Sequence, residues 1–258
     1  MVGGMYISEQ AGEFKPHTNL LDDPFIFETP YVKGCIYYLA AEGGLGGDSF
    51  IIKGDDSLTV SLLADMAGEG VKGRKKIQRF LDYFERIVER GLESTFEKKM
   101  IYQDFINLDQ KVDPDALLAL SFVRTELNKR IYYSNHGENT ILVCKNGETQ
   151  NYSELPEWKI GLFKFMPDQE ELARKTSVCS ADLSSGDRVL LCTDGVLEYF
   201  GDFSAREKRI SSLMSGLSSG QSLEEFIREI NISTNADLHN RKRTRVADDY
   251  TIICVEMR

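Results

Sequence analysis

The chain has 258 residues, of which 41% are hydrophobic, and its formal net charge is −10 at pH 7. This charge argues against a general binder of nucleic acids or anionic membranes, because both partners need a basic face. No apolar run approaches the roughly 18–20 residues that span a bilayer, and the N-terminus lacks the layout of a signal peptide. We therefore expect a cytoplasmic protein with no nucleic-acid partner and no membrane partner.

The five cysteines are odd in number, are scattered along the chain and form no Cys-x-x-Cys pair. A zinc site and a disulfide framework are therefore both disfavoured. The residues concerned are Cys35, Cys144, Cys179, Cys192 and Cys254.

Residues 1–30 contain three prolines and few periodic apolar positions, which predicts an extended N-terminal lead-in. The remaining residues, 31–258, show no internal repeat or flexible linker and are expected to form one domain. Its first predicted strand covers residues 34–41.

A β-hairpin is the clearest local prediction in the sequence. Two runs rich in β-branched and apolar residues, 49–53 and 58–64, flank a Gly-Asp-Asp-Ser turn at residues 54–57. Antiparallel pairing about this turn places Asp48 beside Asp65, within one or two residues. Two carboxylates at one end of a hairpin repel each other unless a cation or proton lies between them. Hard divalent cations prefer such oxygen ligands. Asp residues that merely flank turns are the alternative explanation.

Apolar residues at steps of three and four predict a helix after the hairpin. They are Ile77, Phe80, Leu81, Phe84, Ile87 and Val88. A capping box at Ser94–Glu97 predicts the start of a second helix, and similar boxes at Ser204–Glu207 and Ser222–Glu225 predict a second helix pair. Strands are expected between the pairs and at the C-terminus. Helix pairs beside antiparallel strands predict an α+β fold in which helices cover the sheets.

Two further acidic signals lie at strand ends far along the chain. Asp194-Gly195 follows the apolar strand predicted at 188–193, and Asp248-Asp249 precedes the strand predicted at 250–256. If two sheets bring these ends to the hairpin, the resulting carboxylate cluster requires bound cations for neutralisation.

Four motifs occur in the order and approximate spacing of a known family. They are GGDSF at 46–50, ADMAGEG at 64–70, LCTDGV at 191–196 and DDYT at 248–251. With them, the chain resembles the metal-dependent protein phosphatase (type 2C-like) family, in the bacterial branch typified by SpoIIE and RsbU. The resemblance runs from about residue 20 to the C-terminus. For residues 31–258 it implies a four-layer αββα sandwich of two antiparallel sheets flanked by helix pairs.

The resemblance also implies a site that holds two Mn²⁺ or Mg²⁺ ions. In it, Asp65 bridges the two metals and the Met66 carbonyl is a further ligand, while Asp48, Asp194 and Asp248 complete the shells, partly through waters. Asp65 and Asp48 are thereby the implied catalytic residues. Two such cations generate hydroxide from a shared water near neutral pH and clamp phosphoryl oxygens, so that no protein nucleophile is needed.

A basic run at residues 241–245 lies three residues before Asp248. Because the chain passes close to the predicted site there, we expect Arg243 and Arg245 to bind the substrate phosphate or the acidic residues beside it. The planar guanidinium suits this role, since it contacts two phosphate oxygens at once. A solvated loop is the alternative.

The leading hypothesis is a protein serine/threonine phosphatase of a bacterial signalling pathway, with a phosphorylated partner such as an anti-sigma-factor antagonist. In relatives the first helix pair serves as a switch and a dimerisation surface, which implies a homodimer through the helices at 74–110. One alternative is a pseudophosphatase that acts as a binding module. Another is a hydrolase of small phosphorylated molecules, although no Gly-x-x-x-x-Gly-Lys loop supports a nucleotide substrate.

Overall fold

The structure is a computed structural model that describes most of the chain. The described residues are 5–8, 24–39, 47–66, 75–113, 117–152, 159–165, 168, 170, 173, 177–198, 206–240 and 248–258. In this part of the chain, no helix is long and apolar enough to cross a membrane.

Two six-stranded antiparallel sheets form the centre of the molecule. The first contains β1 (Met5–Ser8), β4 (Asp48–Gly54), β5 (Leu58–Met66), β6 (Leu118–Glu126), β7 (Arg130–His136) and β10 (Cys179–Asp182), in that order. The second contains β2 (Phe25–Glu28), β3 (Val32–Leu39), β12 (Tyr250–Met257), β11 (Arg188–Cys192), β8 (Thr140–Lys145) and β9 (Glu148–Asn151), also in spatial order.

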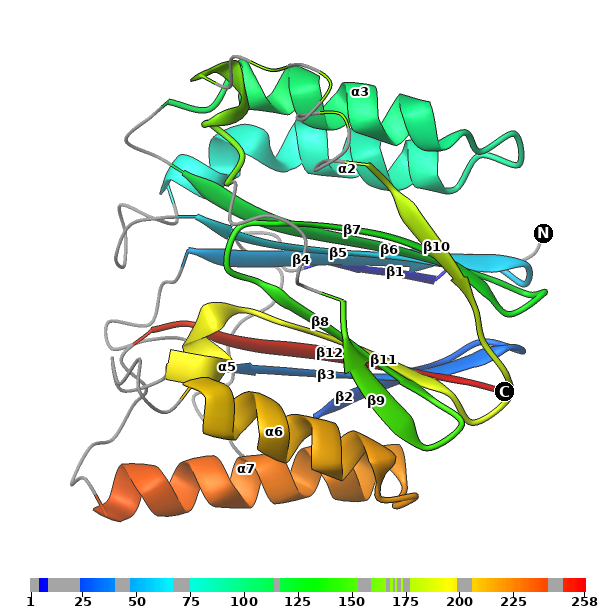
Figure 1. Cartoon of the computed structure of the whole chain (residues 1–258), viewed down its shortest axis with the longest axis vertical. Helices are drawn as coiled ribbons and strands as arrows, with labels where there is room; N and C mark the ends of the chain where they lie inside the picture. The colour runs from blue at the N-terminus through cyan, green and yellow to red at the C-terminus, as the bar shows by residue number, and fades with distance from the viewer. Residues whose placement is uncertain are drawn as a thin grey trace.

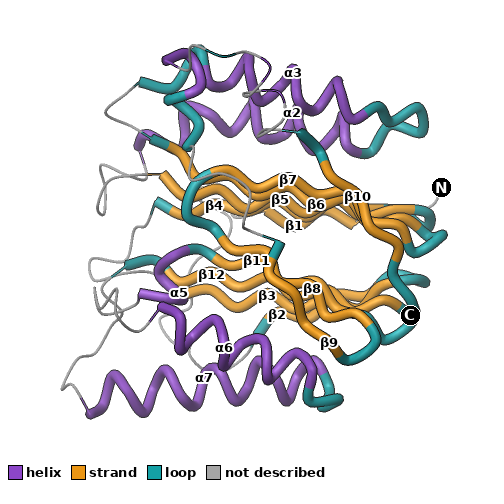
Figure 2. Tube along the Cα trace, viewed as in Figure 1, coloured by secondary structure: helices purple, strands orange, loops and turns teal. Residues whose placement is uncertain are grey.

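The helices cover the outer faces of these sheets. They are α2 (Leu81–Gly91), α3 (Lys98–Asp109), α5 (Asp194–Glu198), α6 (Arg206–Ser218) and α7 (Leu223–Asn240), with 3₁₀ turns η1 (Gln78–Phe80) and η2 (Phe163–Phe165). Figure 1 shows α2 and α3 over the first sheet and α6 and α7 over the second. The four layers are also clear in the trace of Figure 2. The predicted α+β sandwich with a helix pair on each outer face is confirmed.

The central strands alternate their side chains between two apolar layers, as β5 and β12 show. In β5, Leu62 and Ala64 pack with α2 and α3, whereas Leu63 joins the layer between the sheets. In β12, Ile252 packs with α6 and α7, whereas Ile253 lies between the sheets. Three hydrophobic cores therefore separate the four layers, and the parity of a residue number along a strand decides which core its side chain joins.

The stretch predicted only as an extended lead-in contains two edge strands. Strand β1 pairs with β4, and β2 pairs with β3. The sequence signal was weak because each strand is only four residues long. The division of the chain at residue 30 into a lead-in and a domain stays a prediction.

Two predicted capping boxes in the described residues have opposite outcomes. At Ser222–Glu225 the box is formed, because the Glu225 N–H donates to Ser222 Oγ at 3.2 Å and the Ser222 N–H donates to Glu225 Oε2 at 3.0 Å. The box predicted at Ser94 is wrong, since α3 begins at Lys98 and its N-cap residue Glu97 makes no side-chain capping bond. The box predicted at 204–207 begins outside the described residues.

Candidate metal centre

The predicted hairpin brings the first two carboxylates together. Strands β4 and β5 pair so that Asp48 lies directly opposite Asp65. The turn between the strands is held by Asp55, whose Oδ1 accepts from the N–H of Ser57 at 2.7 Å and from that of Leu58 at 3.1 Å. This Asx-type turn fixes the register, and the register places the two acids side by side.

Alternation along the strands sends both acids into the space between the sheets. Asp65 shares its face of β5 with Leu63, which belongs to the inter-sheet core. From the second sheet, Thr251 lies on the same side of β12 as Ile253. At this edge of the sandwich the apolar inter-sheet core therefore gives way to carboxyl and hydroxyl groups.

Asp48 is buried, with 1% of its surface exposed, and accepts two hydroxyl hydrogen bonds from the second sheet. Thr251 Oγ1 donates to Asp48 Oδ2 at 2.5 Å, and Thr193 Oγ1 donates to the same oxygen at 3.0 Å. The Asp48 N–H in turn donates to Asp249 Oδ2 at 3.4 Å. Burial raises the pKa of Asp48 well above its usual range, and the nearby charges of Asp65 and Asp249 raise it further, although the two threonine bonds oppose the shift.

The negative charges of acids in or next to the second sheet act on Asp65. Burial raises the pKa of Asp65 well above its usual range, and the charges of Asp194, Asp248 and Asp249 raise it further, whereas the Lys159 ammonium lowers it. The structure thus gathers the four acids predicted from the sequence and adds Asp249, which is 3% exposed. Such mutual repulsion is relieved when cations bind.

Gly195 explains how Asp194 reaches this cluster. A Cβ atom at position 195 would lie 1.8 Å from the backbone oxygen of Asp249 and 3.4 Å from the Cβ of Asp248. Any side chain there would therefore push the start of α5 away from the start of β12. The glycine in the Asp194-Gly195 motif is required by this close approach rather than by a turn conformation.

The donor set fits a hard divalent cation, because it consists of carboxylate oxygens. The Met66 carbonyl, at the end of β5, lies next in the chain to Asp65. No group of three His, Cys, Asp or Glu side chains within the described ranges is arranged to hold a metal ion unaided. A Mg²⁺-type site tolerates this arrangement, since Mg²⁺ keeps several waters and takes only one or two carboxylates directly.

Comparison with known proteins decides the family. The family described as Stage II sporulation protein E (SpoIIE) matches residues 55–258. The chain belongs to the SpoIIE family. One relative, phosphoserine phosphatase RsbX of Bacillus subtilis (strain 168), is 23% identical over 210 residues, which cover 81% of this chain and 91% of RsbX.

Solved structures show the same fold as this SpoIIE-family chain. The crystal structure of RsbX in complex with magnesium has a TM-score of 0.65 at 19% identity and covers 92% of this chain and 100% of that one. The PP2C phosphatase domain of SpoIIE from Bacillus subtilis has a TM-score of 0.65 at 19% identity, with 88% and 63% covered. The catalytic domain of PstP with two manganese ions has a TM-score of 0.54 at 15% identity, with 88% and 98% covered. The predicted family, branch and fold are confirmed.

The structure adds three residues to this SpoIIE-family site that lie within the family-like motifs at 191–196 and 248–251. Asp249, Thr193 and Thr251 were not predicted as site residues, although each lies within one to three residues of a predicted acid. The predicted phosphate ligands Arg243 and Arg245 lie outside the described residues.

His136, at the end of β7, belongs to the core. Its ring is fully buried between Phe105 and Phe163, with ring centroids 4.7 and 5.3 Å away. Burial lowers the pKa of His136 to about 3. The imidazole is therefore neutral at physiological pH.

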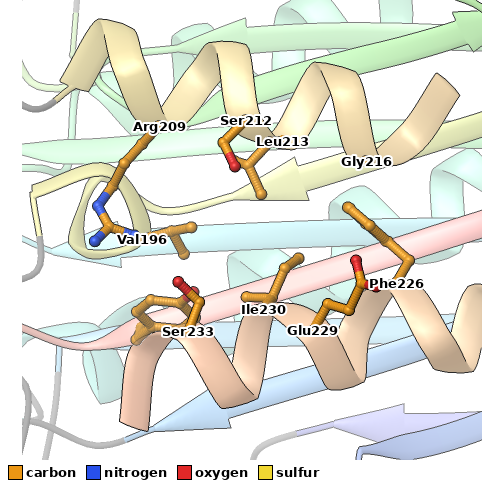
Figure 3. Close-up of a pocket in the computed structure, with 10 residues that line it drawn as sticks. Val196, Arg209, Ser212, Leu213, Gly216, Phe226, Glu229, Ile230 and Ser233 are labelled. Carbon is orange, nitrogen blue, oxygen red and sulfur yellow. The ribbon is translucent and has the colours of Figure 1, made fainter. Parts of the chain in front are cut away.

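A separate cavity of about 220 Å³ lies between α6 and α7. Figure 3 shows Arg209 and Ser212 on α6 facing Ile230 and Ser233 on α7 across it. None of the candidate metal ligands lines this cavity.

Proposed function

We propose that the chain hydrolyses phosphoserine or phosphothreonine in a partner protein by metal-assisted attack of water, with two Mn²⁺ or Mg²⁺ ions held at the acidic edge. The observation that carries the proposal is the register pairing of Asp48 with Asp65, opposite Asp194 and Asp248 from the second sheet. Membership of the SpoIIE family supports it. The relatives RsbX and PstP are described with magnesium and with two manganese ions, respectively.

Each residue has a distinct role in this proposal. Asp65 and the Met66 carbonyl, together with Asp48, Asp194 and Asp248, would hold the two ions, and Asp65 would be the ligand that they share. When bound, two such cations lower the pKa of a shared water and neutralise the charge on the phosphoryl oxygens. The threonine bonds to Asp48 orient its carboxylate, as outer-shell partners commonly do for metal ligands.

The substrate that we propose is a phosphorylated signalling protein such as an anti-sigma-factor antagonist. The relative RsbX is described as a phosphoserine phosphatase, and another similar structure is described under the bacterial stressosome. Both likenesses support a substrate of this class.

The decisive experiment measures phosphate release from p-nitrophenyl phosphate and from a phosphoprotein, with and without Mn²⁺. We expect turnover only with the metal. Binding of Mn²⁺ in calorimetry without any turnover would instead identify a pseudophosphatase. Turnover of small phosphate esters and nucleotides, but not of phosphoproteins, would favour a small-molecule hydrolase.

Replacing Arg243 and Arg245 together by alanine is expected to raise KM for a phosphoprotein far more than KM for p-nitrophenyl phosphate. The proposed arginines contact phosphate and the acidic residues around it, and only the protein substrate supplies the latter. The wild-type phosphoprotein reaction should also weaken with salt, because exposed charges are screened beyond about 8–10 Å at physiological ionic strength. An unchanged phosphoprotein KM in the double variant would identify the run as a solvated loop.

A homodimer through the helices at 74–110 remains a proposal. Phe84 and Ile87 of α2 are 0% and 1% exposed and pack in the core that α2 shares with its own sheet. A second subunit would therefore meet the outward sides of α2 and α3 rather than these side chains.

A further inference from the structure

The segment around Lys159 extends the first sheet at the acidic edge. Ile160 forms an antiparallel bridge with Leu118, in which the Ile160 N–H donates to the Leu118 carbonyl at 2.8 Å and the Leu118 N–H donates back at 3.1 Å. Leu118 is paired on its other side with Met66. Strand β6 therefore lies between Lys159 and the Asp65-Met66 end of β5.

The side chain of Lys159 packs closely against Gly137, which has no Cβ atom to obstruct it. A Cβ at Gly137 would lie 2.8 Å from the Cβ of Ala119 and 3.1 Å from Cγ of Lys159. Ala119 is the register partner of Asp65. The lysine stem thus lies beside the neighbour of Asp65, and its charge lowers the pKa of Asp65.

At its tip the lysine is held by Glu138. Lys159 Nζ lies 2.8 Å from Glu138 Oε2, and the two side chains are 23% and 48% exposed. Burial acts to raise the pKa of Glu138, but hydrogen bonds with Lys159 and Asp194 outweigh it and lower the pKa. Glu138 follows the end of β7, and its carbonyl accepts from Arg206 of α6 at 3.1 Å, so the Lys159–Glu138 pair lies where the two sheets meet.

The backbone after Lys159 is fixed by a buried carboxylate. Asp109, at the end of α3, is 1% exposed and accepts from the N–H groups of Gly161 at 2.5 Å, Phe163 at 2.9 Å and Lys164 at 2.9 Å. Three such bonds to one charged group anchor the segment strongly, since each is charge-assisted. The bonds to Asp109 hold this segment more firmly than the Lys159–Glu138 ion pair alone could, because an exposed ion pair is worth only roughly 0–1 kcal/mol.

We infer that Lys159 is a substrate-binding residue whose ammonium contacts the phosphoryl group, with Glu138 holding it in position. The inference rests on the proposed function and adds a residue to its site. A lysine is a compact point charge with three rotatable donors and a common phosphate ligand. Partial exposure lets a phosphate reach Nζ, and the packing of the lysine stem beside Ala119, the register partner of Asp65, puts that phosphate at the acidic edge.

The test compares wild type with Lys159→Met, and uses Lys164→Met as a matched control. Lys164 lies in the same segment, but its Nζ donates to the Val112 carbonyl at 2.7 Å. Calorimetry of the Mn²⁺-loaded protein measures binding of inorganic phosphate, and a separate titration measures binding of Mn²⁺. Kinetics give KM for p-nitrophenyl phosphate and for a phosphoprotein.

We expect Lys159→Met to weaken phosphate binding by about 10- to 100-fold, as for loss of a hydrogen bond to a charged group, and to raise KM for both substrates. Mn²⁺ binding should be retained or tightened, because a competing cation has been removed. Lys164→Met should match wild type.

Equal phosphate affinity in Lys159→Met and wild type overturns the inference, as does an equal loss in Lys164→Met or a KM effect confined to the phosphoprotein. These outcomes are separate from failure of the proposed function. If wild type binds phosphate through Lys159 but never hydrolyses a phosphate ester, the inference about Lys159 stands and the proposed phosphatase function is rejected. If wild type is active and Lys159→Met binds phosphate with unchanged affinity, the proposed function stands and the inference about Lys159 is rejected.

Discussion

Asp65→Asn is expected to reduce Mn²⁺-dependent phosphate release by about 10³-fold or more while the protein stays folded. Asp65 is the proposed bridge between two ions, and it lies directly opposite Asp48 in the β4–β5 ladder. Charge stabilisation by such ions is worth several kcal/mol, and each 1.36 kcal/mol corresponds to a factor of ten in rate. Asp182→Asn is the matched control, because the Asp182 side chain is 80% exposed and its strand partner is the basic residue Arg130, at 3.6 Å.

Asp65→Asn should also leave the metal-free protein no less stable than metal-free wild type, and should make it more stable near pH 7. The folded-state pKa values of Asp48 and Asp65 are raised, so between the unfolded value of about 3.9 and the raised value the folded state binds more protons than the unfolded state. Stability from these groups is therefore full at low pH and is lost as the pH rises through this window. Because asparagine carries no charge, Asp65→Asn should avoid part of the stability that wild type loses as the pH rises.

Thermal denaturation in chelator at pH 5 and pH 7 tests this stability prediction. Wild type should lose more Tm between the two pH values than Asp65→Asn does. Turnover by Asp65→Asn near the wild-type rate would contradict the metal assignment. A Tm well below that of wild type at pH 7 would contradict the electrostatic argument.

Phe84→Ala is expected to lower the free energy of unfolding by about 3–5 kcal/mol, the usual loss for a buried aromatic side chain. Phe84 has 0% exposure and lies in the core between α2, α3 and the first sheet. Since a domain is stabilised by only about 5–15 kcal/mol, this single change removes a large share. Denaturant unfolding measures it, and Arg86→Ala on the exposed side of α2 should stay within about 0.5 kcal/mol of wild type.

Metal titration of the folded Phe84→Ala protein decides whether α2 only fills the core. Unchanged Mn²⁺ affinity indicates packing alone. Weaker Mn²⁺ affinity in protein that is still folded indicates that the position of α2 also sets the geometry of the Asp65 end of β5. A loss of less than about 1 kcal/mol in unfolding free energy would contradict the burial argument itself.

Local patterns were decisive where the physical cause lies within a few residues. The β4–β5 hairpin followed from alternation and from the turn at Asp55, and the observed register fell inside the predicted range. The capping box at Ser222 formed because its hydrogen bonds join residues three apart. The same pattern at Ser94 forms no cap, because α3 begins four residues later, at Lys98, and Glu97 is its N-cap residue.

The sequence by itself determined the family motifs, the two-sheet class and the four acids. Only the tertiary structure decided how they meet, because Asp48 and Asp249 are 201 positions apart and touch through the packing of one sheet on the other. The close approach at Gly195 likewise exists only between α5 and β12. Lys159 and Glu138 belong to the site for the same reason, since an ion pair between loops at the edge of two sheets leaves no periodic trace along the chain.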